Sequence, residues 1–137
     1  MSPAAGGTPT ADAVHEALQR HALAKPGAWL DEPWDGDLVA KVGDRIFAFL
    51  GGADSATVGI KAAPTREAAD EWLLRYPDDA AVMPYIGRHG WNTLRCDGAI
   101  PLAELLEAID TSYDAVLAKL PRRLRPAAGG SPPAAKA

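Results

Sequence analysis

The chain has 137 residues, of which 47% are hydrophobic and 23% are charged, and its formal net charge is −4. These values predict one globular domain with a full hydrophobic core. A single cysteine excludes an internal disulfide framework and a cysteine-cluster metal site, and no apolar run approaches the roughly 20 residues that span a bilayer. The N-terminus also lacks the basic and apolar segments of a secretory signal. We therefore expect a cytoplasmic protein that does not enter a membrane.

Composition divides the chain into three parts. Residues 1–9 are rich in Ala, Gly and Pro and are predicted to be disordered, residues 10–120 are predicted to fold as one domain, and residues 121–137 are predicted to form a flexible tail. The tail carries four basic residues and no acid, which gives it a charge of +4 and leaves the rest of the chain at −8. With that charge, the domain can attract a polyanion only where its cations are segregated on one face.

The first half of the domain predicts a helix followed by a hairpin. Thr10 is a favourable cap for a helix over 11–23, and the stretch 28–37 is expected to be a short strand or a loop. Two strands, 38–42 and 45–50, are joined by the two-residue turn Gly43-Asp44. Strict alternation then predicts two faces: a core face of Leu38, Ala40, Val42, Phe47 and Phe49, and an outer face of Val39, Lys41, Ile46, Ala48 and Leu50.

The second half predicts a strand over 56–61, a helix from Pro64 to Tyr76, an irregular stretch over 77–90, a strand over 91–96 and a long helix over 101–120. In the last helix the apolar residues recur at i, i+3, i+4 and i+7, which indicates one buried stripe. The order is helix, three strands, helix, strand, helix. It predicts the α+β class, with an antiparallel sheet covered on one face by helices.

Several cations and one tryptophan are predicted to lie on the uncovered face of the sheet or in the loop beside it. Cations interleaved with an aromatic ring suit phosphates and stacked bases. The competing interpretation of the same pattern is a solvated sheet face. The residues on the strands are Lys41, Lys61, Trp91, Thr93 and Arg95, and those in the loop are Arg88 and His89.

The residue pattern offers no catalytic constellation. His15, His21 and His89 are scattered, and neither Ser112 nor Cys96 has a base close to it in sequence. No phosphate-binding glycine loop and no nucleophile elbow is present. The acids of the last helix have a spacing that would allow a hard cation to bind, although a solvated helix face accounts for them as well. We therefore predict a non-enzymatic protein with no metal site and no cofactor. The acids are Glu104, Glu107, Asp110 and Asp114.

Three segments resemble the MmcQ/YjbR family of small bacterial proteins. They are KPGAWLDEPWDGDLVAKVGDRIFAFL, VGIKAAPTREAADEWLLRYPDD and RHGWNTLRCDGAIPLAELLEAIDTSYDAVLAKLPRR. The resemblance as a whole covers roughly residues 10–123. The most specific parts are Trp91-Asn92-Thr93 after a basic loop, the turn at Gly98, the pair Ser112-Tyr113, and Arg45 and Phe47 in the segment RIFA.

The resemblance implies a fold similar to that of frataxin and its bacterial relative CyaY. It also implies a DNA-binding protein of the "double wing" type, in which a sheet and loop surface meets DNA. In our hypothesis the RRLR segment adds sequence-independent attraction. One alternative is a protein-interaction module anchored by Trp91 and Tyr85. A second, borrowed from frataxin, is metal handling. The positions that would contact DNA are Lys41, Arg45, Lys61, Arg88, His89, Trp91, Asn92 and Arg95.

Overall fold

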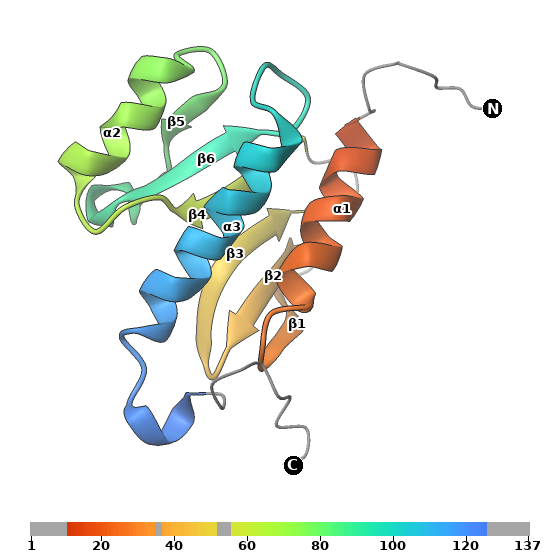
Figure 1. The fold of residues 1–137 in the computed structure, drawn as a ribbon, viewed down its shortest axis with the longest axis vertical. Coiled ribbons are helices and arrows are strands. Elements are labelled where there is room, and N and C mark those ends of the chain that lie inside the picture. The colour runs from red at the N-terminus through yellow and green to blue at the C-terminus, as the bar shows by residue number, and fades with distance from the viewer. Residues whose placement is uncertain (1–10, 35–36, 52–55, 126–137) are drawn as a thin grey trace.

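A computed structural model describes residues 11–34, 37–51 and 56–125, and it contains a six-stranded antiparallel sheet with three α-helices (Figure 1). The strand order is β1-β2-β3-β4-β6-β5. The elements are α1 (Ala11–Leu23), β1 (Ala28–Trp34), β2 (Asp37–Val42), β3 (Arg45–Gly51), β4 (Thr57–Lys61), α2 (Arg66–Arg75), β5 (Ala80–Val82), η1 (Gly87–His89), β6 (Trp91–Arg95), α3 (Leu102–Leu117) and η2 (Arg122–Leu124).

Helices α1 and α3 lie side by side across one face of the sheet, and α2 lies beside β5 and β6 (Figure 1). This arrangement confirms the predicted α+β class. The largest fully buried side chains come from α1, the central strands and α3, and they include Leu18, Phe47, Leu50, Ile60 and Leu105. The core therefore lies between the sheet and the two long helices.

Helices α2 and α3 begin where their capping residues predict, whereas the predicted cap of α1, Thr10, lies outside the described residues. The Thr65 hydroxyl accepts a hydrogen bond from the Ala68 amide at 3.1 Å, which satisfies one of the free amides in the first turn of α2. Pro101 stands immediately before α3, where its missing N–H removes no helical hydrogen bond. In α3 the buried side chains include Leu105, Ile109 and Val116, so the predicted stripe is the one that faces the core.

The predicted faces of the hairpin are wrong for half of β3. Ala40 pairs with Ala48, whereas the next residue of β2, Lys41, pairs with Ile46, so Phe47 is an extra residue in β3. This β-bulge reverses the alternation that follows it. Ala48 and Leu50 are fully buried in the core instead of facing outward, and Phe49 lies outside the core cluster.

Two segments that were expected to be irregular contain regular secondary structure. The stretch 77–90 contains the edge strand β5, which pairs with β6, and the 3-10 helix η1. The predicted tail begins with the 3-10 helix η2, and the Arg125 guanidinium donates to the carbonyls of Ala118 and Leu120 at 3.0 Å. Residues 1–9 and 126–137 lie outside the described part of the chain. Within the described part, no helix is both long enough and apolar enough to cross a membrane.

Candidate functional site

A pocket opens where β3 and β4 separate. These strands pair at Ala48–Ile60 and Phe49–Gly59, and beyond Ile60 the Ser112 side chain of α3 bridges them. Its hydroxyl accepts a hydrogen bond from the Lys61 amide at 2.8 Å and donates one to the Phe47 carbonyl at 2.5 Å. One buried hydroxyl thus takes the place of ladder hydrogen bonds, because it both donates and accepts.

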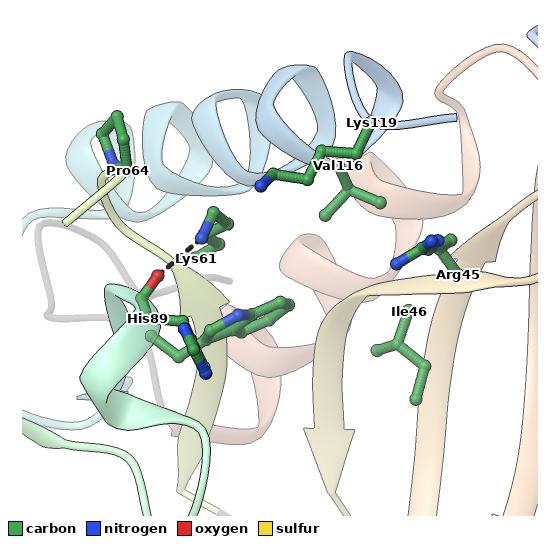
Figure 2. A pocket seen from close by; sticks show the side chains of 8 residues that line it. Arg45, Ile46, Lys61, Pro64, His89, Val116 and Lys119 are labelled. Carbon is green, nitrogen blue, oxygen red and sulfur yellow. Dashed lines mark hydrogen bonds between the residues drawn. The ribbon is translucent and has the colours of Figure 1, made fainter. Parts of the chain in front are cut away.

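The pocket has a volume of about 210 Å³ and combines cations with apolar walls. Figure 2 shows α3 crossing above it, Lys61 and His89 on one side, and Arg45 and Ile46 on β3 opposite. No acid occurs among the described residues that line it. The lining residues are Arg45, Ile46, Lys61, Pro64, His89, Trp91, Val116 and Lys119.

Lys61 is the most buried cation of this pocket, with 7% of its surface exposed. Its ammonium donates to the His89 carbonyl at 2.5 Å, as Figure 2 shows. Burial lowers the pKa of the Lys61 ammonium, and the nearby charge of Lys119 lowers it further. Within the described residues, none of the ion pairs involves a side chain of the pocket. The pocket therefore concentrates positive charge.

The wall formed by η1 and the start of β6 is held by one arginine of α2. The Arg66 guanidinium donates to the carbonyls of Gly87 at 2.7 Å and Trp91 at 3.1 Å, and it is oriented by Asp70 at 2.7 Å. It also donates to the Asn92 side-chain oxygen. These bonds fix the backbone on both sides of His89 and Gly90.

Asn92 was predicted to contact DNA, and the structure contradicts this. Its side chain is fully buried, and its amide donates to the Ala69 carbonyl of α2 at 2.9 Å. Asn92 lies two residues before the core residue Leu94, so it points to the same inner face of β6. It stabilises the fold and is not part of the surface.

Two other predicted contacts have partners of their own. Lys41 forms an ion pair with Asp31 at 2.8 Å, and its ammonium also lies 5.1 Å from the centre of the Trp29 ring. Arg95 binds Asp97 through two hydrogen bonds, at 2.8 and 2.9 Å. The charges of Lys41 and Arg95 are therefore compensated locally. The other predicted contacts line the pocket or adjoin it in the chain, and they are Arg45, Lys61, Arg88, His89 and Trp91.

Lys119 is a pocket residue that the sequence analysis missed. It lies in the turn just after α3, where its amide donates to the Val116 carbonyl at 3.0 Å, so it stands close to the end of the buried stripe. The end of α3, η2 and the β2–β3 turn lie at the same end of the molecule (Figure 1), and a side-chain carbon added at Gly43 would meet Leu120 at 3.2 Å. Arg122 and Arg123 of η2 therefore extend the positive charge from this end.

The uncovered face of the sheet beside the pocket is largely apolar. Trp91 packs edge-on against Phe49, with 5.6 Å between ring centres, and the Met83 side chain lies against Gly59. Val39, paired with Phe49, is fully buried. Tyr85, in the loop after β5, is 98% exposed and has a φ of 70°. Most of the cations of this surface are thus gathered at its end and not spread across it.

The structure gives no support for a metal site at the acids of α3 or for a reactive thiol at Cys96. Glu104 pairs with Arg75, and Asp110 pairs with Lys25 and His21. In the described part of the chain, no three His, Cys, Asp or Glu side chains converge on one point. Burial raises the pKa of the Cys96 thiol to about 11, so this thiol stays protonated at neutral pH.

Comparison with known proteins gives one consistent family. The YjbR family model matches residues 23–115. The Escherichia coli protein YjbR, in strains K12 and O157:H7, is 29% identical over 115 residues, which cover 82% of this chain and 93% of the relative. The crystal structure of a Deinococcus radiodurans protein with a DUF419 domain is 24% identical, with a TM-score of 0.71, and covers 85% of this chain and 93% of its own. This structure shares the fold, and the family match extends over most of the described domain. The chain therefore belongs to the YjbR family.

Proposed function

We propose that this protein binds DNA without catalysing a reaction, using the basic end of the molecule to contact phosphates. The basic end is defined here as Arg45, Lys61, Arg88, His89, Lys119, Arg122 and Arg123. The observation that carries the proposal is charge segregation: the cations at the pocket lack acidic partners within the described residues, whereas Lys41, Arg75 and Arg95 are paired. A domain with a net negative charge can attract a polyanion through such a segregated end.

The apolar centre of the open sheet face narrows the proposal. A surface of Phe49, Trp91 and Met83 offers few groups that pair with phosphate. We therefore place the DNA contact at the end of the sheet and in the η1 loop, and not across the middle of the sheet. Phosphate contacts of this kind give affinity without sequence preference.

Anisotropy of a short labelled duplex measures this binding. If four cations contact phosphates, the affinity should fall about 100-fold as salt rises from about 50 to 200 mM. Arg45→Gln and Arg88→Gln should each weaken binding and reduce the salt slope by about one. The matched control is Arg95→Gln, which removes an exposed charge already bound to Asp97 and should leave the slope unchanged. Equal effects of all three changes would contradict the proposed surface.

A protein partner is the second candidate function, and Tyr85 favours it. A fully exposed aromatic side chain on a left-handed, non-glycine backbone carries a strain of about 1–3 kcal/mol, and such strain often marks a functional position. A photo-crosslinking residue at Tyr85 should capture one specific protein in cells. The matched position is Leu74 of α2, which is also highly exposed, at 81%. If both positions capture the same set of proteins, Tyr85 is not a docking residue.

A further inference from the structure

We propose that the pocket between β3 and β4 binds a terminal phosphate monoester attached to an aromatic base, with the phosphate at Lys61 and Lys119 and the base against Trp91. A free mononucleotide and the phosphorylated end of a nucleic acid strand both carry this chemistry. The site shares residues with the proposed DNA surface, but it does not require that the protein bind a duplex.

The size of the pocket selects a terminal group. Its volume of about 210 Å³ lies below the roughly 300–1,000 Å³ of sites that enclose a drug-sized ligand. Neither a duplex nor an internal phosphate, which continues into a chain on both sides, fits inside such a space. A phosphate at the end of a molecule fits, because only one side of it continues, and the attached group can lie along the open side of the pocket against Trp91.

The charge of the pocket selects a dianion. Arg45, Lys61 and Lys119 line it with no acid among the described lining residues, and the two ammonium groups repel each other. An anion between them would relieve this repulsion. The Lys61 ammonium gives one hydrogen to the His89 carbonyl and has two more for a ligand. A phosphate monoester carries a charge of about −1.5 to −2 at pH 7, against about −1 for each internal phosphate of a strand.

The aromatic wall selects the attached group. Trp91 lines the same pocket, and Phe49 braces its ring edge-on, so the indole is held in place before a ligand arrives. A base can stack on such a ring whatever its identity, since every base has a π-face. Ile46 and Val116 add apolar surface but no hydrogen-bonding side chain. We therefore expect discrimination for the phosphate and little discrimination between bases.

Calorimetric titration of the full chain with adenosine monophosphate and with adenosine tests the phosphate requirement. We expect the monophosphate to bind at least tenfold more tightly, because only it makes the charge-assisted hydrogen bonds. Amide NMR shifts should change at Lys61 and Trp91. Equal affinity for the two compounds, if a 5′-phosphorylated strand is not preferred either, would overturn the proposal. Shifts confined to other parts of the chain would also overturn it.

Two variants and a control locate the phosphate. Lys119→Ala removes an exposed side chain near the end of α3 and should preserve the fold, and Lys61→Met removes the buried ammonium. Each variant should bind adenosine monophosphate at least tenfold more weakly than the unchanged chain. Arg20→Ala removes an exposed cation of α1 outside both the pocket and the basic end and should change the affinity less than twofold. If Lys119→Ala binds the monophosphate like the unchanged chain, the phosphate is not held here.

A second experiment distinguishes a free nucleotide from the end of a strand as the ligand. It also distinguishes the pocket proposal from the proposed DNA binding. A short single strand with a 5′-phosphate is compared with the same strand bearing a 5′-hydroxyl group. Preference for the phosphorylated strand supports the pocket with a strand end as its ligand, and preference for the monophosphate over adenosine supports it with a free nucleotide. Absence of both preferences overturns it. Loss of duplex binding with either preference intact overturns only the proposed DNA function.

Discussion

Replacing Gly90 by alanine is expected to lower the free energy of unfolding by about 3 kcal/mol. Gly90 has a φ of 93°, a conformation that strains any residue with a side chain. A side-chain carbon built there would lie 2.0 Å from the Ala63 carbonyl oxygen and 3.3 Å from that of Thr65. Both neighbours are backbone, so the segment after β4 or η1 itself must move. Urea denaturation followed by circular dichroism measures the change.

Gly43→Ala is the matched control for Gly90→Ala. Gly43 also has a positive φ, 62°, but a side-chain carbon there would meet only the Leu120 side chain, at 3.2 Å. The backbone strain is similar and the steric conflict is with a side chain that can rotate. We expect a loss of about 1–2 kcal/mol at Gly43. Equal losses at the two glycines would mean that the contact with Ala63 is not a tight one.

The position of Gly90 also links stability to the pocket. Its carbonyl accepts a hydrogen bond from the Ala62 amide at 2.7 Å, immediately after β4, and the preceding carbonyl, that of His89, holds the Lys61 ammonium. A shift of η1 that accommodates a side chain at 90 would therefore move one wall of the pocket. Gly90→Ala should therefore weaken the binding of any ligand that depends on Lys61, even where the protein remains folded.

The elements could be predicted from the sequence because their signals are local. The apolar stripe of α3, the cap at Thr65 and the turn at Gly43 each depend on residues within a few positions of one another. The faces of β3 could not be predicted this way, because the bulge at Phe47 is an outcome of pairing with β2. Strict alternation assigned Phe49 to the core, and the true register gives that place to Ala48 and Leu50.

Only part of the candidate site could be predicted, for a related reason. The cations of β4 and the η1 loop were identified by residue type, and alternation alone would have assigned Asn92 to the inner face with Leu94. Nothing local indicates that Lys119, in the turn after α3, lines the same pocket as Arg45, since that depends on where the helix crosses the sheet. Likewise, the pairing of Arg95 with Asp97 requires the geometry of the turn after β6.

The separation of β3 and β4 is what connects the fold to the pocket. In a regular antiparallel pair, the amide of Lys61 and the carbonyl of Phe47 would each bond to the neighbouring strand. Here the bulge in β3 ends the ladder after Ala48–Ile60, and the Ser112 hydroxyl satisfies both groups from α3. A gap that would otherwise leave buried backbone groups unpaired is thus stable, and Arg45, Lys61 and Lys119 can line it.

Ser112→Ala is therefore expected to destabilise the protein by about 2–6 kcal/mol, because it leaves one buried N–H and one buried C=O without a partner at about 1–3 kcal/mol each. The matched control is Thr111→Ala on the exposed side of α3, for which the expected change is below about 0.5 kcal/mol. Urea denaturation gives the global effect, and hydrogen exchange at the Lys61 amide gives the local one. In the variant this amide should exchange faster than its neighbours in β4 even after correction for the global loss, since its acceptor is gone. A Lys61 amide that keeps its protection would mean that β3 and β4 close the gap themselves, and the pocket would then not depend on Ser112.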